Sequence, residues 1–197
     1  NVGIIPRFRL LKNKNIEYAI DKKLIELIKK VFKKPKVKIL FDINNEKLDY
    51  LIISGGNDLL QFSKKINDKE RKKISLHYLN GAIKMNIPVV GICYGAQLIA
   101  SYFKSKLQKK SGHVGAHKIT LFSHSFNTNF PKRIAVNSFH NYAITKISKQ
   151  LLPLGTADDD TVEIFKHKKL KILGLMWHPE RYRNYKKIDI NYFKKNK

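Results

Sequence analysis

The sequence is poor in cysteine and in long apolar runs. Its 197 residues include one cysteine, so no disulfide framework is expected. No segment approaches the roughly 20 consecutive apolar residues that a membrane-spanning helix requires. The first residues also lack the charged, apolar and small-residue sections of a signal peptide. These absences predict a cytoplasmic protein that has no membrane partner.

Acidic residues are also scarce, and lysine dominates the charge. Lys and Arg together number 40 against 15 Asp and Glu, which gives a formal net charge of +25. A balance this basic raises the question of nucleic-acid binding. However, only six of the basic residues are arginines, the lysines are spread along the whole chain, and no helix-turn-helix, RNP or zinc-finger pattern occurs. We expect a solvated, lysine-rich surface and no nucleic-acid partner. The alternative is that this positively charged surface attracts an anionic substrate or membrane.

The chain does have enough apolar material for a packed core, because 43% of its residues are hydrophobic and 11% aromatic. Short apolar runs alternate with amphipathic stretches. Strands are expected at residues 2–5, 36–40, 48–54, 88–92, 119–122, 134–136, 161–165 and 172–177. Helices are expected at residues 16–32, 68–85, 97–103 and 182–193, and a surface loop at 104–111. This alternation predicts an α/β fold in one domain, residues 1–197, with a doubly wound, mainly parallel central sheet flanked by helices.

The sharpest local signal is a cysteine between two glycines, in Gly91-Ile92-Cys93-Tyr94-Gly95. This pattern is typical of a nucleophile that sits on a sharp turn from a strand into a helix, where glycines leave room for the crowded backbone. The N-terminus of the helix favours a thiolate and offers backbone amides to an oxyanion. The alternative is a buried structural cysteine with incidental glycines.

A cysteine nucleophile needs a base and a group that orients it. His178 follows the apolar run Gly174-Leu175-Met176-Trp177, so we expect it at the C-terminal end of a strand, where doubly wound sheets place their sites. Glu180 lies two residues further on and can reach the far ring nitrogen. Taken alone, a histidine at a strand end is more often structural, but the cysteine motif upstream favours a catalytic pair.

The other histidines carry weaker signals. The spacing of His113 and His117 is compatible with metal binding, but the single cysteine, the scattered carboxylates and the lack of a second histidine pair argue against it. We therefore expect no metal ion and no cofactor. Three further histidines are expected at the surface: His77, His124 and His167.

Together these motifs resemble the class I glutamine amidotransferase-like superfamily. The segment Ser54-Gly55-Gly56-Asn57-Asp58 is similar to that superfamily's oxyanion strand. The blocks His113-Val114-Gly115-Ala116-His117 and Val136-Asn137-Ser138-Phe139-His140 resemble its γ-glutamyl hydrolase branch, in particular the hydrolases of γ-glutamyl-CDP-amidate and of γ-glutamyl-γ-aminobutyrate. The resemblance extends from about Val2 to Arg181.

The resemblance implies hydrolysis of a γ-glutamyl amide through a thioester. Cys93 would attack the γ-carbonyl, His178 would transfer the proton and Glu180 would orient His178. The backbone amides of Gly56 and Tyr94 would hold the oxyanion. Gln97 and Ser138 would help to hold the glutamyl part, His140 would lie at the edge of the site, and Glu163 would meet the glutamyl ammonium group. The other residues implied to bind substrate are Gly55, Asn57 and Phe139.

The implied substrate is a small γ-glutamyl amide. It is either the nucleotide-linked γ-glutamyl-CDP-amidate, used in the phosphoramidate modification of bacterial surface polysaccharides, or a γ-glutamyl amine such as γ-glutamyl-γ-aminobutyrate. Specificity for the leaving group is expected in the loops at 59–67, 112–117 and 122–130. The sequence does not determine the oligomeric state and leaves a homodimer open.

Two other functions stay open. Tyr94 stands where many hydrolases of γ-glutamyl-γ-aminobutyrate carry arginine, and tyrosine is commoner there in true amidotransferases. A glutaminase subunit that supplies ammonia to a separate synthase is therefore the first alternative. The non-enzymatic alternative is a basic binding module with a relic pocket, which the complete set of Cys93, His178 and Glu180 argues against.

Overall fold

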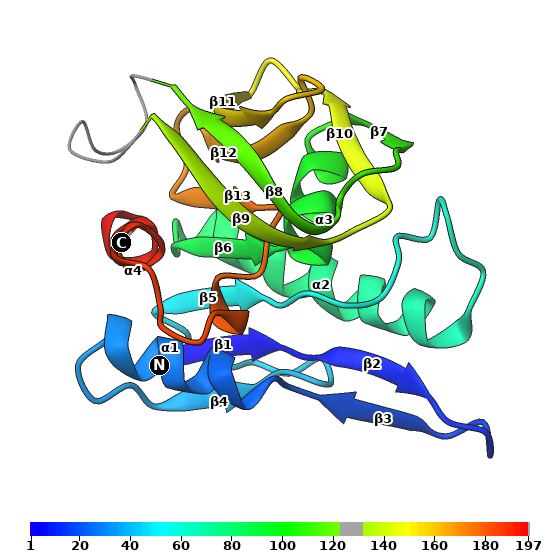
Figure 1. Cartoon of the computed structure of the whole chain (residues 1–197). Helices are drawn as coiled ribbons and strands as arrows, with labels where there is room; N and C mark the ends of the chain where they lie inside the picture. Colours follow the sequence, from blue (N-terminus) through cyan, green and yellow to red (C-terminus); the bar gives the residue numbers. More distant parts are fainter. Residues whose placement is uncertain (123–131, 197) are drawn as a thin grey trace.

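The computed structural model describes residues 1–122 and 132–196, which form a large mixed sheet with helices packed on it and a separate β-hairpin (Figure 1). The strands are β1 (Val2–Ile5), β2 (Arg7–Leu10), β3 (Ile16–Ala19), β4 (Val37–Ile39), β5 (Tyr50–Ile53), β6 (Val89–Ile92), β7 (Lys106–Lys109), β8 (Val114–Leu121), β9 (Arg133–Phe139), β10 (Tyr142–Lys146), β11 (Leu151–Ala157), β12 (Val162–His167) and β13 (Ile172–Leu175). The helices are α1 (Lys22–Val31), α2 (Ile66–Lys84), α3 (Tyr94–Tyr102) and α4 (Lys187–Lys195), with a 3-10 turn, η1 (Pro179–Arg181).

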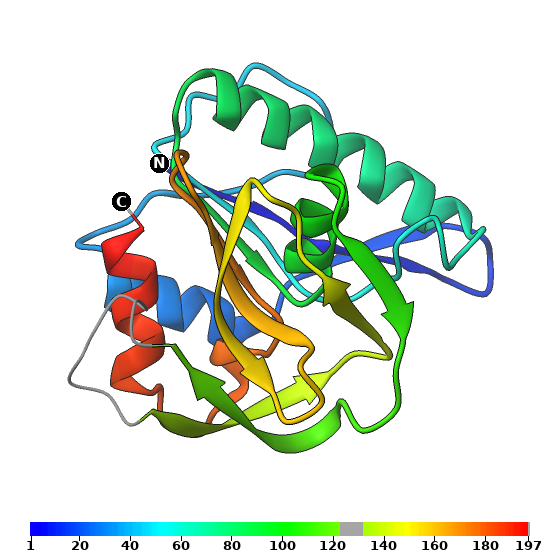
Figure 2. The same ribbon diagram turned by 90° about the horizontal axis from the view of Figure 1, so that it is seen from above.

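The parallel core of the sheet has the strand order β4-β1-β5-β6-β13. Every residue of β1, β5, β6 and β13 is buried, as expected for strands that are covered on both faces. Helices α2 and α3 pack on one face and α1 and α4 on the other, so the sheet separates two apolar clusters (Figure 2). The expected α/β fold with a parallel core is confirmed.

Strand register decides what meets at the edge of this core. Ile92 of β6 lies beside Leu175 of β13, and Gly91 lies beside Ile53 of β5. The three strands run parallel, so their C-terminal ends lie side by side. The segments that follow them begin with Ser54, Cys93 and Met176. This edge is where doubly wound sheets place their sites.

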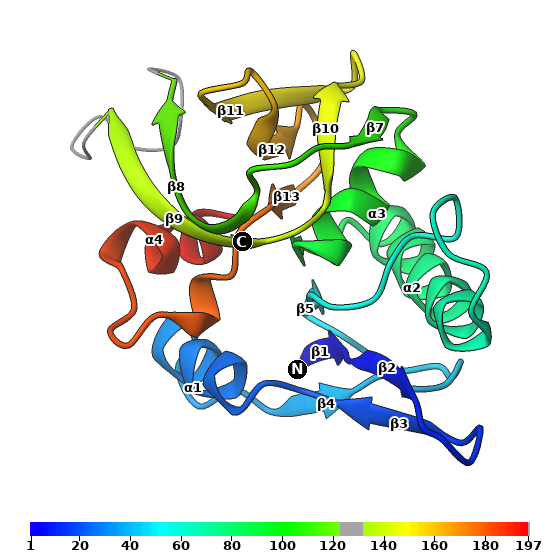
Figure 3. The same cartoon turned by 45° about the vertical axis from the view of Figure 1, so that its right-hand side comes forward.

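An antiparallel half extends the sheet beyond β13 in the order β12-β11-β8-β9, with β10 paired to β12 and β7 paired to β10 (Figure 3). The sheet as a whole is therefore mixed, with more antiparallel strands than the sequence predicted. Residues 106–109 belong to the stretch predicted as a loop, but they form β7 because β10 pairs with them. Lysine-rich strands of this kind show little apolar alternation, so only the partner strand reveals them.

The predicted helix at 16–32 is wrong in its first part. Residues Ile16–Ala19 form β3, which pairs antiparallel with β2 and places Tyr18 opposite Phe8. The helix α1 starts only after Asp21, whose side chain accepts a hydrogen bond from the amide of Lys23 at 3.0 Å. A run of four residues fits either structure, so the pairing partner decided it.

Two other helices differ from their predicted bounds. Helix α3 begins at Tyr94, directly after Cys93 and three residues earlier than predicted. The predicted helix at 182–193 is shifted towards the C-terminus as α4. Within residues 1–122 and 132–196, no helix is both long enough and apolar enough to cross a membrane.

Candidate active site

Cys93 lies at the apex of the turn from β6 into α3, with the backbone angles φ 49° and ψ −101°. A positive φ is uncommon for a residue with a side chain, and such strain clusters at functional sites. A Cβ on Gly91 would come within 2.5 Å of the carbonyl carbon of Gly95, and a Cβ on Gly95 would overlap the carbonyl oxygen of Ile53. Both glycines are therefore required for the close packing of the turn.

His178 and Glu180 meet beside Cys93. The Nδ1 atom of His178 lies 2.7 Å from Oε1 of Glu180, and both side chains are buried. The sulfur atom of Cys93 lies near this imidazole, and both residues line the same pocket. The backbone amide of His178 donates to the Oδ1 atom of Asn137 at 3.0 Å, which ties the strand end to β9. The structure thus brings the three predicted triad residues together.

The surroundings of His178 favour its charged form. Burial by itself lowers the pKa of the imidazole, but hydrogen bonds to Cys93 and Glu180 and the negative charges of both outweigh burial and raise that pKa to about 9. At neutral pH the imidazole of His178 is therefore charged, and it lies next to the sulfur atom of Cys93.

Arg71 of α2 is a residue that the sequence analysis missed. Its side chain is fully buried beneath the double-glycine loop. The guanidinium donates to the carbonyl oxygen of Ser54 at 2.6 Å, to that of Gly56, and to the Oδ1 atom of Asn57 at 2.9 Å. With these carbonyls turned towards Arg71, the loop conformation around Gly56 is held in place. No spacing rule marks a single arginine in a helix whose other basic residues are solvated.

A pocket of about 250 Å³ opens over Cys93 and His178. Its lining residues are Gly56, Asn57, Asp58, Cys93, Gln97, Phe139, His140, Asn141, Tyr142, His178 and Arg181. Four of the predicted substrate-binding residues thus line it, namely Asn57, Gln97, Phe139 and His140. Apart from the histidines, Asp58 and Arg181 are its charged side chains among the described residues, and sequence reasoning named neither of them as a binding residue.

The other three predicted substrate-binding residues do not line this pocket. Gly55 packs against the imidazole of His178, and a Cβ at Gly55 would overlap the ring. Ser138 and Glu163 are completely buried. The carboxylate of Glu163 lies among His113, His117 and His140 instead of facing the pocket.

His77 and His167, which the structure describes, do not line the pocket. His77 is exposed, as predicted. His167 is buried, contrary to prediction, because its Nδ1 atom accepts hydrogen bonds from the amides of Lys169 and Leu170 in the turn after β12. His124 lies outside the described residues.

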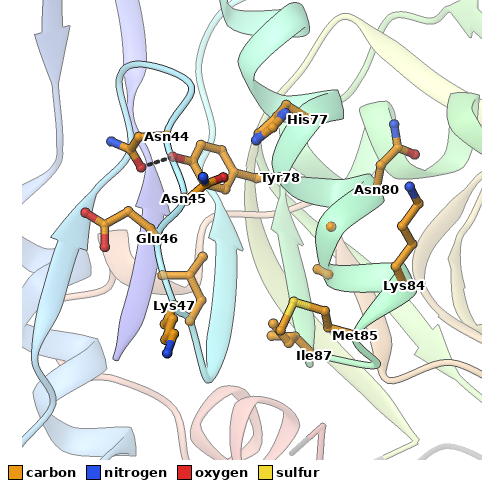
Figure 4. A pocket seen from close by; sticks show the side chains of 13 residues that line it. Asn44, Asn45, Glu46, Lys47, His77, Tyr78, Asn80, Lys84, Met85 and Ile87 are labelled. Carbon is orange, nitrogen blue, oxygen red and sulfur yellow. Dashed lines mark hydrogen bonds between the residues drawn. The ribbon is translucent and has the colours of Figure 1, made fainter.

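A larger hollow, of about 590 Å³, lies away from the triad between α2 and the segment before β5 (Figure 4). In it, the hydroxyl of Tyr78 donates to Oδ1 of Asn44 at 2.8 Å, and Met85 and Ile87 contribute apolar surface. Its lining contains no cysteine, serine or threonine, so the smaller pocket over Cys93 is the better candidate for chemistry in spite of its size.

Comparisons with known proteins identify the family of the chain. The family model of peptidase C26 matches residues 37–180. The γ-glutamyl-CDP-amidate hydrolase of Campylobacter jejuni is 39% identical over 140 residues, which cover 71% of this chain and 66% of that protein. A subunit of the glutamine-hydrolysing GMP synthase of Pyrococcus furiosus is 28% identical over 148 residues, which cover 74% of this chain and 73% of that protein.

Solved structures share the fold. A protein described as a GMP synthase subunit from Thermoplasma acidophilum matches 99% of this chain and 90% of its own with a TM-score of 0.72 at 19% identity. A glutamine amidotransferase from Thermotoga maritima matches 91% of this chain and 75% of its own with a TM-score of 0.67 at 18% identity. At these identities the structures establish the fold alone.

Because the family model matches most of the chain and the fold agrees, the chain belongs to the peptidase C26 family of γ-glutamyl hydrolases within the class I glutamine amidotransferase-like proteins.

Proposed function

We propose that this protein hydrolyses the amide bond of a γ-glutamyl compound through the triad Cys93, His178 and Glu180. One observation carries the proposal. Three adjacent parallel strands end together and place a strained cysteine, a charged histidine with its carboxylate partner and a double-glycine loop around one pocket. This set supplies a nucleophile, a proton donor and an oxyanion site at once.

In the first half of the reaction, the Cys93 thiolate attacks the γ-carbonyl carbon and forms a C–S bond. The carbonyl oxygen becomes an oxyanion, held by the backbone amides of Gly56 and Tyr94. The latter lies in the first turn of α3, where amides lack intrahelical partners. His178 gives its proton to the leaving nitrogen, the C–N bond breaks, and a γ-glutamyl thioester remains on Cys93.

In the second half, His178 is neutral and accepts a proton from a water molecule that attacks the thioester carbonyl. The C–S bond breaks, glutamate leaves, and the thiolate and imidazolium form again. Glu180 keeps the imidazole oriented through its contact with Nδ1 in both halves. No cofactor takes part in this scheme.

The pocket suits the two charges of a glutamyl group. Of the lining residues, we assign Asp58 to the α-ammonium and Arg181 to the α-carboxylate, because their charges are opposite to those of the two groups. Gln97 and His140 also belong to the lining. The Nε2 atom of Gln97 already donates to the carbonyl oxygen of Tyr142 at 2.8 Å, so its Oε1 atom is the group available to substrate.

For the leaving group we propose the cytidine diphosphate amidate, because the Campylobacter jejuni relative is named for that substrate and is 39% identical over 71% of this chain. The net charge of +25 is compatible with an anionic, nucleotide-linked substrate. The second candidate is a glutaminase subunit. It is favoured by Tyr94 and by the similarity to the GMP synthase subunit of Pyrococcus furiosus, which is 28% identical.

The test is glutamate release by the purified protein from γ-glutamyl-CDP-amidate, γ-glutamyl-γ-aminobutyrate and glutamine, with the Cys93→Ala variant as the control. Release from the first substrate that Cys93→Ala abolishes is the expected result. Weak release from glutamine alone would favour the glutaminase subunit. The absence of release from all three, with Cys93 still open to alkylation, would refute the proposal.

A further inference from the structure

A second cluster of reactive side chains lies behind the pocket, in the antiparallel half of the sheet. Glu163 on β12 is completely buried, and three imidazoles surround its carboxylate. His113 precedes β8, His117 lies on it and His140 follows β9. The strands β8 and β9 curve past β12 (Figure 3), which brings residues from three parts of the chain to one point.

The distances in this cluster lie at or beyond the upper end of the range for hydrogen bonds between nitrogen and oxygen. His113 Nδ1 lies 3.2 Å from Glu163 Oε1, His140 Nε2 lies 3.4 Å from the same oxygen, and His117 Nε2 lies 3.5 Å from Oε2. None of these nitrogens and neither carboxylate oxygen has a hydrogen-bond partner within the part of the chain that the structure describes. Buried polar atoms rarely lack a hydrogen-bond partner, so we expect a bound ligand at the centre of the cluster.

His113 also has neighbours at its other ring nitrogen. Its Nε2 atom lies 3.3 Å from Oδ2 of Asp159 and 3.4 Å from Oγ1 of Thr161, both at the edge of the cluster. A proton on Nε2 that faces Asp159 leaves a lone pair on Nδ1, directed at the carboxylate of Glu163. In that neutral tautomer two acceptors face each other in a buried site, an arrangement that needs either a further proton or a metal cation between them.

We propose that His113, His117 and Glu163 bind a divalent transition-metal ion, with zinc as the best fit. Each offers one ligand atom, and these atoms all lie within 4.8 Å of one another. Zinc bonds of 2.0 to 2.2 Å in a tetrahedron separate neighbouring ligands by about 3.3 to 3.6 Å. His113 and His117 approach the two oxygens of the Glu163 carboxylate at similar spacings, 3.2 Å to Oε1 and 3.5 Å to Oε2. Two imidazoles with one carboxylate are a common zinc set, and His140 is the available fourth ligand.

The surroundings fit a metal site in two further ways. Asp159 stands at the far nitrogen of His113, as carboxylates do behind metal-bound histidines. The backbone amide of His140 donates to the carbonyl oxygen of His113 at 3.3 Å, and His140 also lines the pocket over Cys93. A metal ion here would join β8, β12 and the turn after β9, and so would support one wall of the pocket.

The experiment measures zinc binding to untagged protein after treatment with a chelator. The Cys93→Ala background is used, because the thiolate and His178 form a competing site and because the result then does not depend on catalysis. We expect one zinc ion per chain by mass spectrometry, a higher melting temperature with zinc, and the strong visible absorption of a four-coordinate Co²⁺ site. Glu163→Gln and His117→Ala should weaken the affinity at least about 100-fold and Asp159→Asn about 10-fold.

The matched controls are His77→Ala and His167→Ala, which remove histidines outside the cluster and should bind zinc like the parent. His117 is only partly buried, with a side-chain exposure of 15%, so His117→Ala remains informative if Glu163→Gln fails to fold. Less than about a tenth of an equivalent of bound zinc, or an affinity that His117→Ala leaves unchanged, would overturn the proposal. Glutamate release by the protein with Cys93 intact tests the proposed function separately.

Discussion

The guanidinium of Arg71 lies 4.0 Å from the ring centroid of Tyr94. The same guanidinium holds the carbonyl oxygens of Ser54 and Gly56. One buried cation thus links the residue after the candidate nucleophile to the loop that carries the other oxyanion amide. Burial lowers the pKa of Arg71 to about 10, so it remains charged at neutral pH.

Replacement of Arg71 should therefore slow catalysis more than it weakens binding. Arg71→Lys keeps the charge but loses the planar fork that bonds several carbonyls at once. We expect kcat to fall about 10- to 100-fold, because a shift of the oxyanion amides by even 1 Å has an effect of that size, while KM changes little. Steady-state kinetics measure kcat and KM, and circular dichroism shows whether the variant is folded. Arg133→Lys, at an exposed arginine that pairs with Asp158, is the control. An unchanged kcat would contradict the role assigned to Arg71.

Two glycines should respond in opposite ways to alanine. Gly95→Ala places a Cβ against the carbonyl oxygen of Ile53, so we expect a loss of about 3 kcal/mol or more in the free energy of unfolding, or no folded protein. Gly81 lies in α2 with nothing within 4 Å of its added Cβ, so Gly81→Ala should stabilise the fold by about 0.5 to 1 kcal/mol. Urea denaturation of both variants checks this prediction, and equal effects at both positions would contradict it.

The pH dependence of catalysis should reflect His178. Its pKa of about 9 predicts that kcat/KM declines above about pH 9, where the imidazolium that protonates the leaving nitrogen is lost. Glu180→Gln removes a charge that raises this pKa, so the decline should move to lower pH and kcat should fall. Because folding raises this pKa above 6.5, the stability gained from the charged imidazole is present below that pH and is lost as the pH rises through 9. A pH–rate profile that is identical in both proteins would count against the contact between Glu180 and His178.

A buried carboxyl behind the triad should give a second, separate pH effect. The indole of Trp177 donates to Oδ1 of Asp189 at 3.0 Å, and burial raises the pKa of Asp189 from 3.8 to about 7. A carboxyl whose pKa rises on folding destabilises the fold when it ionises, so the free energy of unfolding should fall as pH rises from about 4 to 7. Asp189→Asn keeps the acceptor and should gain about 2 to 4 kcal/mol at pH 8 but little at pH 4.

The measurement for Asp189 is urea denaturation at both pH values, with the exposed Asp158→Asn as the control. The control should show no such difference between the two pH values. A gain from Asp189→Asn of equal size at pH 4 and pH 8 would mean that ionisation of this carboxyl is not the cause.

The charged residues of the pocket should affect KM. Loss of one hydrogen bond to a charged group corresponds to about 1.5 to 3 kcal/mol, so Asp58→Asn and Arg181→Gln should each raise KM for a γ-glutamyl amide by about 10-fold or more. Arg183→Gln, at an exposed arginine two residues further on, should leave KM unchanged. A normal KM in Asp58→Asn would mean that another group meets the substrate ammonium.

The central elements of the fold could be predicted from the sequence, because each depends on a pattern of neighbouring residues. The apolar run at Val89–Ile92 predicted a buried parallel strand, and the glycines around Cys93 predicted the turn that follows it. The antiparallel half was harder to predict. The strand β7 is rich in lysine, and β3 occupies a run that also fits a helix, so pairing with another strand decided both.

The sequence by itself determined the family, the α/β class and the three residues expected to carry the chemistry. The family and the three residues follow from short motifs of neighbouring residues, and the α/β class follows from the alternation of apolar and amphipathic stretches. Tertiary structure alone decided which other side chains accompany them. Arg71 is buried beneath the double-glycine loop. Glu163, which was predicted to bind substrate, lies among three histidines and not in the pocket. The physical reason is distance along the chain. Residues that are 15 to 50 positions apart become neighbours only through helix packing, strand register and sheet curvature, and no local spacing records any of these.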